Sequence, residues 1–181
     1  MQLQNEKAPH KSYLVFDPVG VATSERNNLR YFHQMFEWQR LYPNRFDFLN
    51  TEDIEFYAGL GEKLEKNMKR HFIELMGEAD HIIVPASATT NVDSPLLNWQ
   101  ISQAVNGFRL PVIVCYMGVE NIFVKDFVRY ENWVPAKIRK YISRDSALIA
   151  HIPFTRDKLE RAVASFSLKD HLLPWNSTTI F

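Results

Sequence analysis

Two almost uninterrupted apolar runs, residues 81–86 and 112–117, constrain the fold of this chain more than any other feature. Short runs rich in β-branched residues are typical of strands that are buried on both faces of a parallel sheet. Parallel neighbours require a crossover connection, which is usually a helix. The two runs therefore predict a sheet whose strands alternate with helices along the chain.

Three further short apolar segments and five helical patterns complete this alternation. The predicted strands are residues 13–16, 46–49, 81–86, 112–117 and 147–153. The predicted helices are residues 27–42, 60–77, 95–107, 135–141 and 156–166. Right-handed crossovers between these elements predict an α/β fold: a doubly wound, flavodoxin-like parallel sheet of five strands in the order 2-1-3-4-5, with helices on both faces. The long connector 119–133 is expected to cover the edge or the mouth of this sheet.

The length and composition favour one ordinary globular domain. The 181 residues divide into a polar N-terminal segment 1–11, an α/β domain 12–168, and a tail 169–181 expected to pack on the body or on a partner. The 21 basic and 21 acidic residues balance, so no overall field attracts nucleic acid or a membrane. Residues 1–11 lack the apolar core of a secretory signal, and no apolar run is long enough to cross a bilayer. The single cysteine, Cys115, is expected to fill the core, and this cysteine usage predicts a cytoplasmic location.

Several familiar chemistries are not supported by the residues that they need. The loop after the first predicted strand contains one glycine, Gly20, so neither the dinucleotide fingerprint nor the P-loop fits. Thr23 and Ser24 in that loop are the only hydroxyls that could contact a flavin-type phosphate. No two of the six histidines stand three or four residues apart, and with one cysteine no metal site is predicted.

Two aspartates follow predicted strands on the side where α/β sheets bind ligands. For Asp17, a role in the site and a role as a turn residue are equally supported. For Asp93, capping of the nearby backbone is the better interpretation, because aspartate readily accepts hydrogen bonds from amides two or three residues on.

Residues 94–101 mark the start of a helix at this same edge of the sheet. Ser94 suits the N-cap and Pro95 the first helical position. The helical spacing places Trp99 and Gln100 on a stripe beside the face that packs on the sheet. Two interpretations stay open: Trp99 and Gln100 line the mouth above the third strand, or they lie on the helix flank and its solvated surface. Spacing alone favours the second.

The same segment, followed by Ala104 and the strand-like run 109–114, resembles the TIR-like domains related to the Thoeris antiphage defence proteins. Those domains carry a hydroxyl residue, a Trp-Val pair, an Asn-Trp or Arg-Tyr type pair and then Glu-Ile. The resemblance extends over residues 13–166 and is specific over 64–117. It departs from the family pattern at Leu96, which replaces the tryptophan, and in the loop after the first strand.

The resemblance implies a TIR-type fold and a role in immunity. Active TIR enzymes cleave NAD at the nicotinamide–ribose bond, and their key residue is the glutamate of this helix. Gln100 occupies that position, and a carboxamide cannot stabilise the positive charge that develops on the ribose. Loss of such a contact slows a reaction by roughly a hundredfold or more. Asp17, Glu25 and Asp93 are the carboxylates that could substitute.

The expected site therefore combines a degenerate catalytic position with a set of pocket residues. Gln100 holds the degenerate position and Asp17 is its candidate substitute. The residues expected to bind the ligand are Ser87, Ser94, Trp99, Thr23 and Ser24. The sequence specifies no certain cofactor; NAD or a related nucleotide is the candidate ligand or substrate.

Three functions stay open from the sequence. The first is a TIR-like signalling or defence domain with a degenerate NAD-type pocket, acting by binding a nucleotide-like molecule or by self-association. The second is an active NAD glycohydrolase or cyclase, or a related enzyme that breaks N-glycosyl bonds. The third is a non-catalytic interaction module, in which the ring-rich segment 30–42 contacts a partner protein rather than packing under the C-terminal tail.

Overall fold

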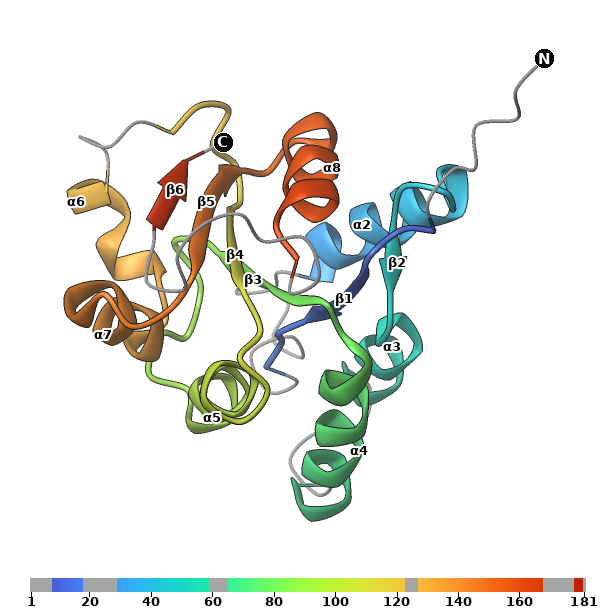
Figure 1. Ribbon diagram of the computed structural model, residues 1–181, viewed down its shortest axis with the longest axis horizontal. Helices are drawn as coiled ribbons and strands as arrows, with labels where there is room; N and C mark the ends of the chain where they lie inside the picture. The colour runs from blue at the N-terminus through green and yellow to red at the C-terminus, as the bar shows by residue number, and fades with distance from the viewer. Residues whose placement is uncertain (1–7, 18–28, 59–64, 123–126, 168–177, 181) are drawn as a thin grey trace.

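The computed structural model describes residues 8–17, 29–58, 65–122, 127–167 and 178–180. Its centre is a parallel sheet (Figure 1). The strands are β1 (Lys11–Leu14), β2 (Asp47–Phe48), β3 (His81–Ala86), β4 (Val112–Tyr116), β5 (Ile149–Pro153) and β6 (Thr178–Ile180). They lie in the order β2-β1-β3-β4-β5-β6, and every neighbouring pair is parallel. The predicted order 2-1-3-4-5 is thus confirmed, and residues 178–180 of the expected tail add a strand beside β5.

Helices cover both faces of this sheet (Figure 1). Two of them, α2 (Leu29–Leu41) and α8 (Arg156–Ser165), lie on one face. The other face carries α4 (Glu65–Glu78), α5 (Pro95–Ser102) and α7 (Ala136–Arg144). Shorter elements are α3 (Thr51–Ala58), α6 (Phe127–Tyr130) and the 3-10 turn η4 (Glu131–Trp133). The doubly wound α/β architecture is therefore the one that the alternating pattern predicts.

The apolar runs form the centre of the core, because the strands that they build are buried on both faces of the sheet. Every residue of β3, β4 and β5 is buried. Cys115 lies in β4 with none of its side chain exposed, and burial raises the pKa of its thiol. It therefore fills the core, as expected.

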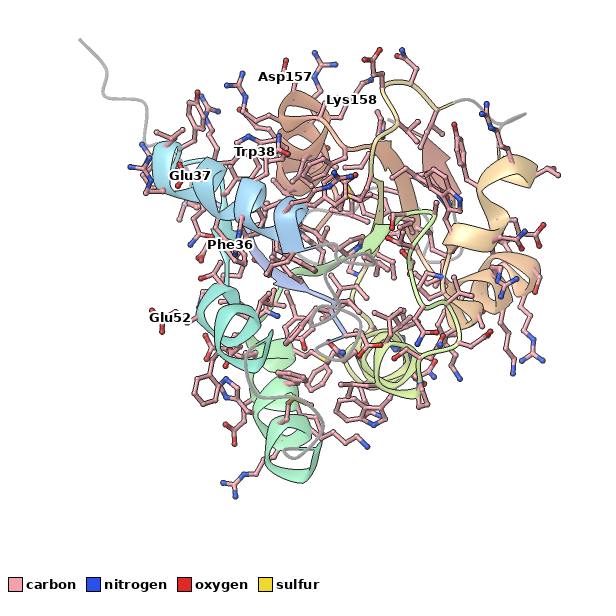
Figure 2. The ribbon with its side chains drawn as sticks, turned by 180° about the vertical axis from the view of Figure 1, so that it is seen from behind. Phe36, Glu37, Trp38, Glu52, Asp157 and Lys158 are labelled. Carbon is pink, nitrogen blue, oxygen red and sulfur yellow. The ribbon has the colours of Figure 1, made fainter. Side chains whose placement is uncertain are left out.

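The segment with many rings, 30–42, packs mainly inward. Figure 2 shows α2, with Phe36 and Trp38 labelled, beside α8, with Asp157 labelled. The Trp38 ring lies 5.0 Å from the Phe154 ring and 6.2 Å from the Phe46 ring. The Trp38 ring of α2 thus packs against Phe154 before α8 and Phe46 before β2. Neither of these partners belongs to the C-terminal tail.

Some predicted boundaries were wrong. The helix that Ser94 and Pro95 predict does begin at Pro95, but its second half, Gln103–Gly107, is the π-helical turn η2. Helix α3 was not predicted, although its first turn carries two acidic residues that favour a helix N-terminus. Residues 60–64 of the predicted helix 60–77 lie outside the described part of the chain.

Candidate functional site

The strand order places the switch point of the sheet between β1 and β3. In doubly wound sheets, ligands bind in the crevice beyond the carboxyl ends of the strands at this point. Here that edge is formed by residues 15–17 after β1, by residues 87–94 after β3, and by the start of α5. Gln100 on α5 is hydrogen-bonded to Phe16, two residues beyond the end of β1.

Gln100 is completely buried and is bonded to the segment that follows β1. Its Oε1 accepts a hydrogen bond from the Tyr13 hydroxyl at 2.8 Å and from the Phe16 amide at 3.4 Å. Its Nε2 donates to the Phe16 carbonyl at 2.6 Å and to the Leu96 carbonyl at 3.4 Å. The side chain therefore lies neither on the helix surface nor among water, which removes the surface interpretation of this residue.

These four hydrogen bonds leave the carboxamide of Gln100 no N–H group with which to bind a ligand. A primary amide has two N–H donors, and both are engaged here. Tyr13 stays a neutral donor, because burial, helped by the carboxylate of Asp53, holds the pKa of its hydroxyl well above the usual value. Gln100 thus acts in this structure as a clamp between α5 and the end of β1.

A second carboxamide, Asn50, holds the same strand from the other side. It follows β2, and its Nδ2 donates to the Leu14 carbonyl at 2.8 Å while its Oδ1 accepts from the Leu14 amide at 2.9 Å. Asn50 and Gln100 together satisfy the backbone of residues 14 and 16, which therefore need no further strand partner. Sequence reasoning missed Asn50; its position directly after a predicted strand was the available signal.

A group of hydroxyls lies directly beyond β3. The Ser87 amide donates to Thr90 Oγ1 at 2.8 Å, and Ser87 Oγ lies 3.1 Å from Thr89 Oγ1. Ser87 is buried, whereas Thr89 is exposed. Of the predicted ligand-binding residues, Ser87 therefore lies at the switch point. Thr89 and Thr90 add two hydroxyls beside it, and Thr89 is the one exposed to solvent.

The start of α5 has the predicted cap. Ser94 Oγ accepts from the Leu97 amide at 3.2 Å, and Pro95 is the first helical residue. Ser94 is buried and engaged in this cap. Asn98 extends the arrangement, because its Nδ2 donates to the Val92 carbonyl at 2.8 Å and its Oδ1 accepts from the Lys137 amide at 2.8 Å. The loop after β3 is thus tied to both α5 and α7.

The other predicted site residues are placed as follows. Trp99 is half-buried on the flank of α5, with the Lys69 ammonium 5.5 Å from its ring centre. Asp17 is half-buried and directly follows Phe16, whereas Asp93 is exposed. Thr23, Ser24 and Glu25 lie outside the described residues. The structure therefore brings Gln100, Ser87 and Asp17 to one edge of the sheet.

No protein-family model matches the chain, and no curated protein matches it. Within the described residues, no helix combines the length and apolar character needed to span a bilayer. No three His, Cys, Asp or Glu side chains in the same described part of the chain gather closely enough to hold a metal ion.

Proposed function

We propose that this protein is a TIR-like signalling or defence domain that binds a nucleotide-like ligand, such as NAD, at the β1–β3 switch point without cleaving it. One observation carries the proposal: hydroxyl groups of Ser87, Thr89 and Thr90 gather beyond β3, while the carboxamide at the expected glutamate position is consumed by internal bonds. Hydroxyl groups suit the ribose and phosphate groups of a nucleotide, because they both donate and accept hydrogen bonds. The resemblance of residues 94–101 to TIR-like domains points to the same class of ligand.

The hydrogen bonds of Gln100 explain why the protein would bind a nucleotide without cleaving its N-glycosyl bond. Cleavage of an N-glycosyl bond needs an anion beside the developing oxocarbenium ion. Gln100 is neutral and already bonded on both its nitrogen and its oxygen. Its contribution is to hold the segment after β1 in place, which preorganises the edge of the switch point.

Isothermal titration calorimetry with NAD and ADP-ribose tests ligand binding. We expect saturable binding to the native protein, weakened in Thr89→Val, because this exposed hydroxyl can be removed without opening the core. Thr155→Val, at the N-cap of α8 after β5, removes a hydroxyl that makes no capping bond and should bind as the native protein does. Absence of binding, together with a monomer in light scattering, would reject both the ligand-binding and the self-association forms of the proposal.

Asp17 supports a second candidate, an enzyme that breaks N-glycosyl bonds. It directly follows Phe16, whose amide and carbonyl are both bonded to Gln100, so a carboxylate stands next to the clamped backbone. The test is nicotinamide release from NAD, measured by chromatography. Release that is lost in Asp17→Asn supports this candidate, and absence of release from the native protein refutes it.

A further inference from the structure

A hollow lies over β4 and β5, away from the β1–β3 switch point. Its volume is about 260 Å³, and its lining includes Tyr116 of β4, His151 of β5 and Arg139 of α7. Its apolar walls come from Val128, Val134 and Ile142, on the segment that runs from α6 into α7. Val128 is 82% exposed and Ile142 38%, so this side of the hollow opens to solvent. Val128 and Glu131 of the connector predicted to cover the sheet thus line this hollow.

The floor of the hollow is polar but uncharged. The Tyr116 hydroxyl and His151 Nδ1 form a buried hydrogen bond of 2.9 Å. Burial lowers the pKa of His151 to about 4 and raises that of Tyr116. Both groups are therefore neutral near pH 7, and the pair offers hydrogen-bonding atoms without a competing charge.

Arg139 supplies a cation at the wall. Its Nε is buried and has no hydrogen-bond partner among the residues that the structure describes. Arg139 lines the hollow, and a guanidinium is well suited to a carboxylate, because its N–H groups donate charge-assisted hydrogen bonds. Helix α7 contains three further basic residues and no acidic one. The acid in the lining, Glu131, is exposed, so water screens its charge more than that of the buried guanidinium edge.

We propose that this hollow binds a small carboxylate with an aromatic or branched apolar body. The carboxylate would accept hydrogen bonds from Arg139, and the apolar part would lie against Val134 and Ile142. The volume is sufficient, because a cavity of about 150 Å³ already holds benzene and this one measures about 260 Å³. This site lies on different strands from the proposed nucleotide site and does not depend on it.

Benzoate and its uncharged isostere benzamide are the probes for this site. By ligand-observed NMR titration we expect benzoate to bind with a Kd on the order of 1 mM, as suits a ligand of this size. Benzamide should bind at least about tenfold more weakly, because it lacks the charge-assisted bond. In protein-observed spectra, benzoate should shift the amide signals of Ile142 and Ser143 and leave that of Gln100 unchanged.

Variants of α7 separate the role of Arg139 from general attraction by a basic helix. Arg139→Gln should weaken benzoate binding at least about tenfold and leave benzamide binding unchanged. Arg144→Gln removes an equal charge from the last turn of the same helix and should bind benzoate normally. The proposal is overturned if benzoate and benzamide bind the native protein equally, if neither binds, or if the two arginine variants lose benzoate equally. If Arg139→Gln does not fold, the comparison of benzoate with benzamide on the native protein still tests the proposal.

Discussion

Replacement of Gln100 by glutamate is the most informative single change, because it restores the residue that the family resemblance expects at this position. In the structure, Gln100 Nε2 lies 2.6 Å from the Phe16 carbonyl oxygen, and the side chain is fully buried. A glutamate oxygen at that place would face another acceptor unless it carries a proton. The protonated acid preserves the shape and donates to Phe16, whereas the carboxylate loses this bond and is buried without a counter-charge.

The size of the effect follows from the pKa of the new carboxyl group. Its unfolded value is about 4.3, and glutamates buried without a partner reach about 8 to 9. Because the folded pKa is raised, the variant keeps its full stability below about pH 4.3 and loses it as the pH rises toward the folded pKa. The loss is about 1.4 kcal/mol per pH unit, which amounts to on the order of 3 to 4 kcal/mol at pH 7.

Urea unfolding between pH 5 and pH 8, followed by tryptophan fluorescence, measures this loss. The difference in unfolding free energy between Gln100→Glu and the native protein should widen steadily with pH. Gln103→Glu, half-buried three residues further along, is the control and should show little pH dependence. A difference that stays constant across this range would refute the reasoning, since it would mean that the new carboxylate is hydrated. Nicotinamide release by a stable Gln100→Glu protein would instead indicate a catalytic scaffold that lacks only the charge.

Three further predictions rest on other parts of the structure. Burial lowers the pKa of His81 to about 3 and that of His151 to about 4, so the unfolded chain binds protons below about pH 6.5 that the folded chain excludes. Stability should therefore fall as the pH drops from 6.5 to 4, by about 1.4 kcal/mol per pH unit for each histidine, and His151→Gln should reduce this slope in urea titrations. Ser94→Ala removes the bond to the Leu97 amide and should lower the unfolding free energy by about 1 kcal/mol; an unchanged urea midpoint would contradict the cap. Cys115 is buried with a raised thiol pKa, so its reaction with a thiol reagent should follow the unfolding rate, and rapid labelling of the native protein would disprove this.

The sequence was sufficient where the signal is local. The two apolar runs specified β3 and β4, because strands covered on both faces admit almost no polar side chain. The alternation of strands with helical stripes then led to the parallel order, since crossovers of one hand leave few other arrangements. Ser94 and Pro95 were sufficient to mark the start of α5, because a capping side chain bonds to an amide only three residues away.

The edges of elements were less predictable, because long-range partners decide them. Strand β1 was expected at residues 13–16 and occupies Lys11–Leu14. Lys11 joins the strand because its backbone amide donates to Asp80 Oδ2 at 3.0 Å while its ammonium reaches Glu78 at the same distance. The β1–β2 pairing ends at Ser12, and the amide and carbonyl of Leu14 are bonded to the Asn50 side chain instead.

The sequence by itself determined the class of fold, the order of the central strands and the place of the switch point between β1 and β3, because periodicity records which face of each element is buried. Only the tertiary structure decided what Gln100 does there. Its partner Phe16 is 84 residues away in the sequence, and the bond depends on the register of α5 against β1. A hydrophobic pattern indicates which positions are buried. It does not indicate the hydrogen-bond partners of a buried carboxamide, because these come from segments that are distant in the sequence.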